Sequence, residues 1–464
     1  MPASLHDAPA GHDQPWTPDS WQSRPALHLP EYPDAPQLAA ATRELSKLPP
    51  LVTSWEIERL RAVLAEAQQG KRFLLQGGDC AETLDDCQPQ RITNKLKILL
   101  QMSLVLVHAL KKPVVRVGRF AGQYSKPRSS PVETREIGGE PVTLPSYFGD
   151  LVNRAEFTPQ ARRADPRLLL KGYQHAALTL NFVRSLVAGG FADVHHPEYW
   201  DVSFSKQASL DPALRAEYQR MTANLIDGLK FMEAMGETSI NDLTRAEFFT
   251  SHEALNLWYE SAQTRPVPRR AGFYNLSTHL PWIGDRTRAL GGAHVEYARG
   301  IRNPVGVKLG PTATANDLVH LATTLNPANE PGKLVFITRM GAHHVQRVLP
   351  PLLEAAKIAG INPLWVCDPM HGNTTTTLTG VKTRSFEAIV AELEATYAAH
   401  QLAGVPLGGV HLELTGDDVT ECTGGAVGIT ESQLSQNYAS ACDPRLNYQQ
   451  ALEVAFLLAR RMGR

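Results

Sequence analysis

The sequence predicts an α/β protein, a (β/α)8 (TIM) barrel with an N-terminal extension and a helical insertion between the second and third strands. Short apolar runs typical of buried strands alternate with stretches of helical character. In the second half of the chain, one strand follows the next after about 30–45 residues, the length of a βα unit. Polar loops containing Gly and Pro follow these runs, as expected at the catalytic end of a barrel. A doubly wound open sheet is the alternative.

Eight runs are the strand candidates, and the last of them is the weakest. They are Phe73–Gln76, Val114–Val117, Glu247–Thr250, Val305–Lys308, Leu334–Thr338, Leu364–Cys367, Val410–Leu414 and Tyr438–Ala441. Helices are expected between them, for example over 315–325, 345–359 and 385–402. Eight such strands separated by helices favour a parallel barrel over an open sheet.

The chain divides into an arm and a barrel. Residues 1–70 are rich in Pro near their start and contain Trp16 and Trp21, so we expect an arm whose aromatic rings pack on the barrel or on a neighbouring subunit. Residues 71–464 form the barrel. Within it, residues 130–245 are too many for one crossover connection and predict an inserted helical segment with a regulatory or oligomerisation role.

One helix of this insertion is marked at both ends. It begins with Asp211 as N-cap and Pro212 in the first turn, and it ends at Gly236. Its apolar stripe consists of Leu214, Tyr218, Met221, Leu225, Leu229 and Met232. The stripe either packs on the barrel or belongs to a subunit interface or effector pocket, and the length of the insertion favours the latter.

Charge and composition exclude several classes of protein. The 464 residues include 46 Lys and Arg against 47 Asp and Glu, a balance that argues against a nucleic-acid or membrane-surface partner. The apolar run Leu99–Leu110 is interrupted by polar residues and is too short to span a bilayer. Five scattered cysteines fit a reducing compartment, and the N-terminus lacks the pattern of a signal peptide. We therefore expect a cytoplasmic protein.

Four residues at the ends of strand candidates form a predicted metal set. They offer one thiolate, one imidazole and two carboxylates: Cys80, His371, Glu413 and Asp443. Mixed sulfur, nitrogen and oxygen ligands suit Mn, Co, Fe or Zn better than Ca. Taken singly, the Cys and the His are more typical of structural residues. Cys442 directly precedes Asp443, which leads to the hypothesis that it forms a disulfide with Cys80 under oxidation.

A second set of strand-end residues is cationic. It comprises Arg119, Lys126, Arg128, Arg286, Arg288, Lys308 and Arg339. Guanidinium groups bind phosphate and carboxylate through two parallel hydrogen bonds. So many cations at one end of a barrel predict one or two substrates that carry several negative charges.

These motifs resemble those of the class II (plant-like) 3-deoxy-D-arabino-heptulosonate-7-phosphate (DAHP) synthases over nearly the whole chain. The segments that carry the resemblance are 16–21, 32–34, 76–82, 126–129, 250–254, 300–304, 367–373 and 442–447. The resemblance implies a (β/α)8 enzyme that condenses phosphoenolpyruvate with erythrose 4-phosphate and water, giving DAHP and phosphate. This reaction is the first step of the shikimate pathway, which leads to chorismate and the aromatic amino acids.

The resemblance also implies a role for each site residue. A divalent metal, Mn or Co before Fe, Zn or Cd, would be held by Cys80, His371, Glu413 and Asp443, and Cys80, His371 and Lys126 would be catalytic. Phosphoenolpyruvate would be bound by Arg119, Lys308, Arg339 and the pair Asp285-Arg286. Erythrose 4-phosphate would be seated by Lys126, Arg128 and Ser129. The family usually has Glu at the position of Asp285, and Lys126 is the candidate for the acid–base group that acts on water.

Family members with a long insertion between the second and third strands are typically inhibited by aromatic amino acids. This chain has the long form, so the resemblance implies allosteric inhibition and a homodimer or homotetramer; a separate chorismate mutase is a partner in part of the family. A metal-dependent barrel aldolase is the enzymatic alternative. A catalytically inactive binding subunit is the non-enzymatic one, and the intact set of site residues argues against it.

Overall fold

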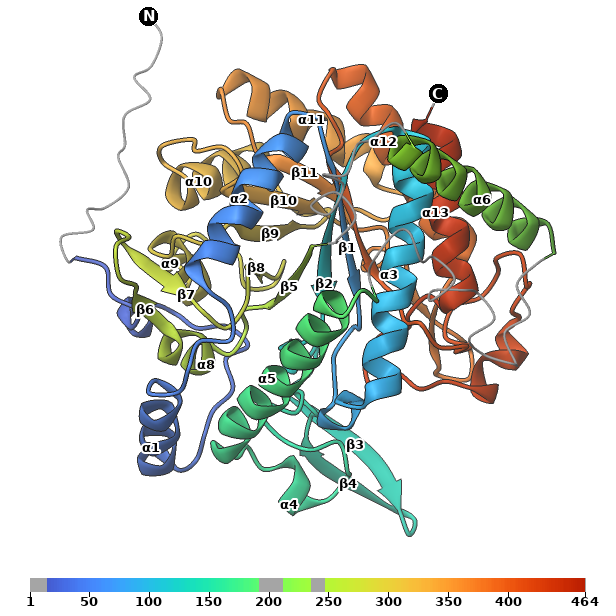
Figure 1. Ribbon diagram of the computed structural model, residues 1–464. Coiled ribbons are helices and arrows are strands. Elements are labelled where there is room, and N and C mark those ends of the chain that lie inside the picture. The colour runs from blue at the N-terminus through green and yellow to red at the C-terminus, as the bar shows by residue number, and fades with distance from the viewer. Residues whose placement is uncertain (1–14, 192–211, 235–246, 464) are drawn as a thin grey trace, which may run out of the picture.

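The computed structural model describes residues 15–191, 212–234 and 247–463. Eight parallel strands close into a barrel (Figure 1), in the order β1-β14-β11-β10-β9-β8-β5-β2. The barrel strands are β1 (Phe73–Gly78), β2 (Val114–Arg119), β5 (Phe248–Glu253), β8 (Leu280–Ile283), β9 (Val305–Leu309), β10 (Leu334–Thr338), β11 (Leu364–Cys367) and β14 (Gly409–Glu413). The predicted (β/α)8 barrel is confirmed, and the open sheet is wrong because the first and last strands, β1 and β14, pair in parallel.

The fourth and eighth strands differ from the sequence prediction. The fourth strand, β8, was missed because it has four residues and contains Pro281, which weakens a strand signal. The predicted strand Tyr438–Ala441 is wrong. The backbone N–H groups of Ala439 and Ser440 donate to the Glu421 carboxylate, so they cannot join a strand ladder. The eighth strand is β14, and the loop that contains Asp443 follows it.

Helices follow the strands and surround the barrel. They are α3 (Pro89–Leu110), α8 (Leu257–Ala262), α9 (Ala293–Arg299), α10 (Ala315–Leu325), α11 (Val345–Ile358), α12 (Phe386–Ala403) and α13 (Tyr448–Met462). Side chains that precede them fix where several begin: Thr314 and Asn447 form capping boxes, and Ser385 caps α12. The helices predicted over 315–325, 345–359 and 385–402 are confirmed within one residue.

One helix outside the repeat, α2 (Ser54–Gln68), closes the N-terminal end of the barrel. Its apolar side chains, such as Leu60 and Leu64, share one core cluster with interior residues of the strands. Gln68 donates to the Asn362 carbonyl and accepts from the Gly332 N–H, and both of these residues lie just before strands begin. The barrel interior is therefore filled at this end, and a ligand pocket is confined to the opposite, C-terminal end.

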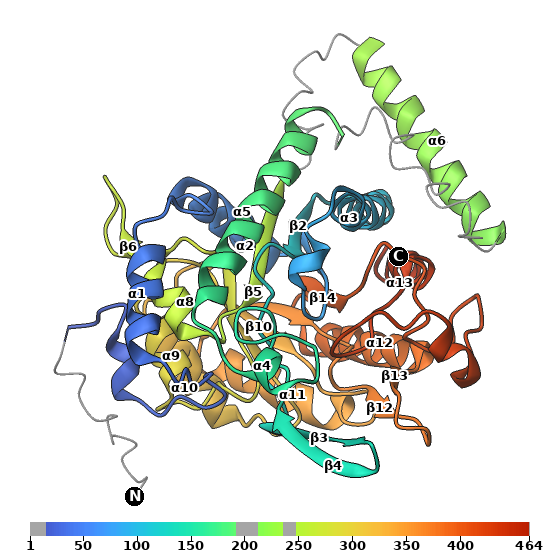
Figure 2. The same cartoon turned by 90° about the horizontal axis from the view of Figure 1, so that it is seen from below.

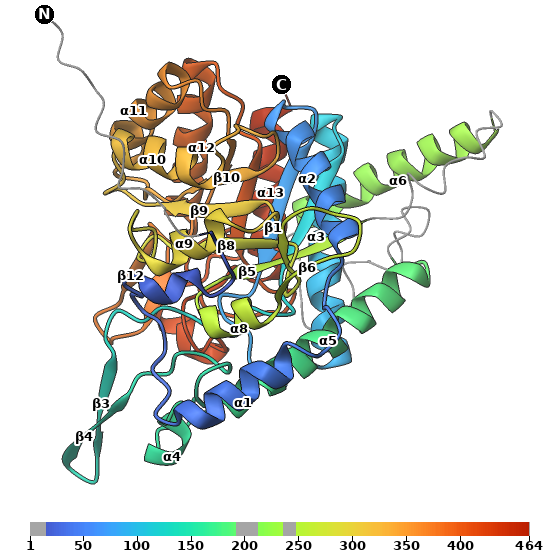
Figure 3. The same cartoon turned by 90° about the vertical axis from the view of Figure 1, so that its left-hand side faces the viewer.

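The segment that precedes α2 packs on the barrel. It contains a short 3-10 helix, η1 (Ser20–Ser23), and α1 (Ala35–Leu45), which contacts α5 and α8 (Figure 3). The Trp16 ring meets Phe273 edge-on at 5.3 Å, and its Nε1 donates to the Glu296 carbonyl at 2.9 Å. The Trp21 ring is buried against Trp258. The alternative contact with a neighbouring subunit stays a prediction, and residues 1–14 lie outside the described range.

The connection from β2 to β5 carries the additional elements. These are the hairpin of β3 (Val132–Ile137) and β4 (Glu140–Pro145), followed by α4 (Pro159–Arg162), α5 (Arg167–Ala188) and α6 (Pro212–Ala234). Figure 2 shows the hairpin and α6 extending from different sides of the barrel. Tyr218 and Met221 of α6 are buried in the core that includes α3. The caps predicted at Asp211 and Gly236 lie outside the described residues, as do the other four side chains of the stripe.

Smaller elements complete the described chain. They are the short helices η2 (Leu84–Asp86) and η6 (Glu431–Gln436) and the hairpins formed by β6 (Thr264–Pro266) with β7 (Phe273–Asn275) and by β12 (Thr374–Thr376) with β13 (Lys382–Arg384). Among the helices in the described ranges, none is both long enough and apolar enough to traverse a bilayer.

The role of α2 predicts a stability difference between two leucine truncations. Leu64→Ala removes a side chain that is 0% exposed and is expected to lower the free energy of unfolding by about 2–5 kcal/mol. Leu402→Ala, on the exposed face of α12, is the control, with an expected change within about 0.5 kcal/mol. Urea denaturation followed by circular dichroism measures both, and equal changes for the two variants would show that α2 does not seal the barrel core.

Candidate active site

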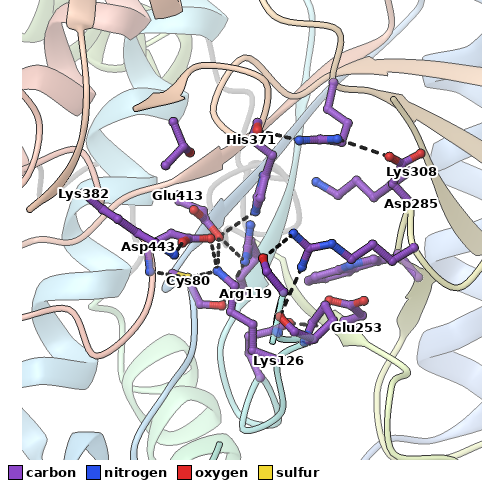
Figure 4. Close-up of a pocket in the computed structure, with 18 of the residues that line it drawn as sticks. Cys80, Arg119, Lys126, Glu253, Asp285, Lys308, His371, Lys382, Glu413 and Asp443 are labelled. Carbon is purple, nitrogen blue, oxygen red and sulfur yellow. Dashed lines mark hydrogen bonds and ion pairs between the residues drawn. The ribbon is translucent and has the colours of Figure 1, made fainter. Parts of the chain in front are cut away.

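A pocket of about 340 Å³ lies at the C-terminal ends of the barrel strands (Figure 4). All eight barrel strands, or the loops that follow them, contribute residues to it. These include Cys80 after β1, Arg119 of β2, Glu253 of β5, Trp282 of β8, Lys308 of β9, Arg339 after β10, His371 after β11 and Glu413 of β14. Cys80, Glu413 and Asp443 lie on one side of the pocket, whereas Lys308 and Asp285 lie on the other. The pocket is thus built by the same strand ends that the sequence singled out.

The structure brings together most of the predicted site residues. Eleven of the twelve line this pocket: Cys80, Arg119, Lys126, Ser129, Asp285, Arg286, Lys308, Arg339, His371, Glu413 and Asp443. The twelfth, Arg128, does not line it and directs Nη1 toward the Cys442 sulfur at 3.8 Å. Arg288 of the cationic set pairs with Asp285 and Asp317 instead of facing the pocket.

Three predicted metal ligands form a compact group. The Cys80 sulfur and one carboxylate oxygen each of Glu413 and Asp443 lie within 4.8 Å of one another. His371 Nε2 lies 2.9 Å from Glu413 Oε1, so the fourth predicted ligand borders the group. A thiol, an imidazole and two carboxylates that converge in a buried corner fit a borderline divalent ion such as Mn or Co. Cys80 and Cys442 are both free thiols and pack in one small cluster with Tyr147.

The Glu413 carboxylate is fully buried and remains anionic. Burial by itself would raise its pKa, but His371, Lys126 and two arginines lower that pKa well below its ordinary value. Arg119 Nη2 donates to Oε1 at 2.9 Å, and Arg384 Nη1 donates to Oε2 at 2.6 Å. A permanently charged carboxylate with one oxygen directed toward Cys80 and Asp443 is suited to hold a cation.

The Lys126 ammonium lies among the same three groups. Its Nζ contacts the Cys80 sulfur and lies 2.5 Å from Asp443 Oδ2 and 3.8 Å from Glu413 Oε1. Burial opposes its charge, but Asp443, Cys80 and Glu413 raise the pKa of Lys126 well above its ordinary value. Lys126 is therefore held as a cation beside the metal set.

The opposite side of the pocket is cationic. Burial lowers the pKa of Lys308 to about 8, although the neighbouring Asp368 opposes the shift. Arg339 Nη1 lies 3.2 Å from Asp285 Oδ2, and Asp285 Oδ1 accepts from the Gly310 N–H at 2.9 Å. The Asp285 carboxylate thus connects Arg339 to the Gly310 backbone.

The loops after β2 and β8 meet at Arg286. Its Nη2 donates to Ser129 Oγ at 3.1 Å, and its Nη1 donates to the Pro127 carbonyl at 3.4 Å. The two loops therefore approach each other at the rim of the pocket. The family resemblance assigns Arg286 to phosphoenolpyruvate and Ser129 to erythrose 4-phosphate, and in the structure these two residues meet at one rim.

Glu253, which ends β5 and lines the pocket, was not among the residues predicted from the sequence. Its Oε1 is buried and makes no hydrogen bond to any other described residue. Burial raises the pKa of Glu253 to about 7, although Lys126, Lys308 and two arginines oppose the shift. The sequence signal was its position at the end of a strand inside a motif that resembles the family, but no role could be assigned to it there.

The hairpin of β12 and β13 was also missed. Thr374, Thr376 and Lys382 line the pocket, and Lys382 Nζ lies 3.1 Å from Asp443 Oδ1. Arg384, at the end of this hairpin, is fully buried and bonds to Glu413. The loop that follows the seventh strand is thus a wall of the site, which its Thr-rich sequence did not indicate.

Comparison with known proteins identifies relatives of this chain. The model of the class-II DAHP synthetase family matches residues 16–459. The phospho-2-dehydro-3-deoxyheptonate aldolase of Neurospora crassa is 49% identical over 461 residues, covering 96% of this chain and 94% of that protein. The enzyme of the same name from Streptomyces coelicolor is 47% identical over 441 residues, covering 95% and 96%.

A third relative agrees with these two. The phospho-2-dehydro-3-deoxyheptonate aldolase AroG of Mycolicibacterium smegmatis is 44% identical over 447 residues, covering 95% of this chain and 93% of that protein. The family model spans the arm, the barrel and the β2–β5 connection, so the match includes every strand end that lines the pocket. The chain belongs to the class-II DAHP synthetase family.

Proposed function

We propose that this chain is a 3-deoxy-7-phosphoheptulonate (DAHP) synthase. It would condense phosphoenolpyruvate with D-erythrose 4-phosphate and water to give DAHP and phosphate, the first step of the shikimate pathway. The observation that carries the proposal is the division of one pocket into a group of metal-type ligands and a facing group of cations. The names and high coverage of the relatives support it.

The cations match the charges of the two substrates. Phosphoenolpyruvate carries a carboxylate and a phosphate, and we assign both to Arg119, Lys308 and Arg339 on the inner side of the pocket. The phosphate of erythrose 4-phosphate is assigned to the rim, where Ser129 and Arg286 meet and Arg128 is close by. Each substrate is thereby oriented by fixed donors, which lowers the entropic cost of bringing the two reacting carbons together.

The metal group is assigned to Cys80, His371, Glu413 and Asp443. We expect Mn or Co, with Fe, Zn or Cd as alternatives, because a thiolate beside imidazole and carboxylate favours borderline ions. When bound, such an ion supplies a Lewis acid that polarises the aldehyde of erythrose 4-phosphate. The flanking cations Lys126, Arg119 and Arg384 keep Glu413 charged and fix its orientation.

We assign the acid–base step to Glu253. When C3 of phosphoenolpyruvate attacks the aldehyde carbon, cationic character develops at C2; water adds there and must lose a proton before phosphate leaves. Lys126 is held as a cation chiefly by the anionic Asp443 and Glu413 and is a poor base. Glu253 lines the pocket, has an unpartnered buried oxygen and titrates near neutrality, as a general base should.

The proposal also covers how the enzyme is regulated, how its subunits assemble and where it is located in the cell. We infer that aromatic amino acids inhibit the enzyme and that a homodimer or homotetramer forms through the elements between β2 and β5. The projection of α6 away from the barrel, with Tyr218 and Met221 as its buried anchor, supports a role in contacts outside the barrel. We also propose a cytoplasmic location, a separate chorismate mutase as a partner, and a disulfide between Cys80 and Cys442 under oxidation.

The first prediction from the proposed function concerns metal dependence. Purified protein mixed with both substrates is expected to consume phosphoenolpyruvate and release phosphate. EDTA is expected to abolish the reaction because the metal group would be emptied, and added Mn²⁺ or Co²⁺ is expected to restore it. The absence of turnover in the metal-restored protein would contradict the proposal, whereas retro-aldol cleavage without phosphate release would favour the alternative aldolase.

The second prediction separates the metal ligands from other thiols. Cys80→Ser and His371→Ala are each expected to lower Mn²⁺ affinity by more than the roughly 10- to 100-fold that loss of an outer-shell partner costs. Cys87→Ser is the matched control, since Cys87 does not line the pocket and its sulfur forms hydrogen bonds with the His175 carbonyl and Thr179. Calorimetric titration of Mn²⁺ measures all three, and wild-type affinity in Cys80→Ser would remove this residue from the metal set.

The third prediction concerns pH. Because the Glu253 carboxyl with a pKa of about 7 must be ionised to accept a proton, wild-type kcat/KM is expected to fall as the pH is lowered through 7. Glu253→Gln is expected to lower kcat by about 10²- to 10⁴-fold and to lose this acidic limb.

Glu392→Gln is the control for the pH profile. The buried Glu392 also has its pKa raised to about 7, chiefly by burial, but it does not line the pocket. That variant is expected to keep the acidic limb even if its rate changes. A profile of Glu253→Gln with the wild-type limb would rule out Glu253 as the base.

A further inference from the structure

A buried carboxylate that does not line the pocket connects the two sides of the site. Asp368 follows β11 and is 0% exposed. Its Oδ2 accepts from His371 Nδ1 at 2.7 Å and also contacts Lys308 Nζ. His371 belongs to the predicted metal group and Lys308 to the predicted substrate group, so one oxygen atom serves both.

The contacts form a continuous chain across the pocket floor. Glu413 Oε1 lies 2.9 Å from His371 Nε2, whose opposite ring nitrogen bonds to Asp368 Oδ2, which in turn contacts Lys308 Nζ. Figure 4 shows Glu413 and Lys308, the two ends of this chain, on opposite sides of the pocket. Lys308 Nζ also lies 6.0 Å from the centre of the Trp282 ring.

The backbone holds the Asp368 carboxylate in place. Its Oδ1 accepts from the N–H groups of Met370 at 2.9 Å and of His371 at 3.3 Å. Its own N–H donates to the Thr338 carbonyl at 2.7 Å, which attaches the residue to the end of β10. Because Oδ1 is fixed in this way, Oδ2 cannot turn away from either partner.

We propose that Asp368 is a positioning residue that couples metal occupancy to substrate occupancy. The proposal rests on the proposed function, since it uses the assignment of His371 to the metal and Lys308 to phosphoenolpyruvate. It concerns a residue that would touch neither the metal nor the substrate and would act through those two side chains.

The physical basis is competition for one oxygen. A hydrogen bond from Nδ1 to a carboxylate fixes the orientation of a metal-binding imidazole and raises its basicity at Nε2. An anionic substrate would accept hydrogen bonds from the Lys308 ammonium and draw it away from Asp368 Oδ2. The hydrogen bond that His371 Nδ1 donates to Oδ2 would then become stronger. Phosphoenolpyruvate should therefore tighten metal binding, and by reciprocity the metal should tighten phosphoenolpyruvate binding by the same factor.

The coupling is measured by calorimetric titration of Mn²⁺ into metal-free protein, with and without saturating phosphoenolpyruvate. The ratio of the two Kd values is the quantity of interest. In the wild type, we expect phosphoenolpyruvate to tighten Mn²⁺ binding by about 5- to 150-fold. In Asp368→Asn, we expect Mn²⁺ binding without substrate to weaken by about 10- to 100-fold and the ratio to fall toward 1.

A matched control and a second variant separate this role from a general loss of structure. Glu296→Gln alters another buried carboxylate that is paired with a cation, Arg299 on α9, and is expected to keep the wild-type affinity and ratio. Lys308→Met removes the ammonium, so that the Asp368 Oδ2 atom keeps only its hydrogen bond from His371. It is expected to bind Mn²⁺ at least as tightly as the wild type, with a ratio near 1, and it tests the idea even if Asp368→Asn does not fold.

Three results would overturn the coupling: a wild-type ratio of 1, an unchanged ratio in folded Asp368→Asn, or weaker Mn²⁺ binding in Lys308→Met. Circular dichroism and thermal melting establish folding in each case. Failure of the proposed function is seen separately, as absence of phosphate release by the metal-loaded wild type, so the two hypotheses do not fail through the same measurement.

Discussion

The charge of Glu413 is the constraint around which the C-terminal end of the barrel is organised. A buried carboxylate is costly unless cations and hydrogen bonds compensate for its lost hydration. Here the compensation comes from Arg119 at the end of β2, Arg384 of the β12–β13 hairpin, and the loops that carry Lys126 and His371. Segments that lie far apart in the sequence therefore meet at this one group, and their meeting defines the floor of the pocket.

The near-zero net charge of the chain hides a strong local separation of charge. The Cys80 thiol and the carboxylates of Glu413 and Asp443 lie on one side of the pocket, and Lys308 lies on the other. Trp282 lines the same pocket, with the Arg119 guanidinium 5.2 Å from its ring centre. A low-dielectric wall beside fixed charges strengthens their interaction with small anions. This arrangement suits small phosphorylated substrates better than a polyanionic polymer, which would need a cationic surface instead of a cationic pocket.

Strand-end residues could be predicted from the sequence because a barrel places them together whatever their separation along the chain. Cys80, Lys308 and Glu413 were identified in this way. The remaining site residues depend on tertiary contacts that have no periodic signal. Trp282 lies on a strand whose Pro281 concealed it, and the raised pKa of Glu253 results from burial that only the closed barrel creates. Asp368 stood within a recognised motif, yet its link to Lys308 requires β9 and β11 to be placed on either side of β10.

Tertiary contacts also account for two glycines that follow barrel strands. A Cβ atom at Gly284 would lie 2.1 Å from Glu253 Oε1, and one at Gly310 would lie 2.4 Å from Asp285 Oδ2. Both carboxylates thus pack directly against a glycine backbone. The missing side chain leaves the room that each carboxylate needs beside the neighbouring cations. A side chain at either glycine would therefore clash with the carboxylate and displace it. The glycines that first marked these segments as loops are therefore part of the site, because they provide the space that its charges occupy.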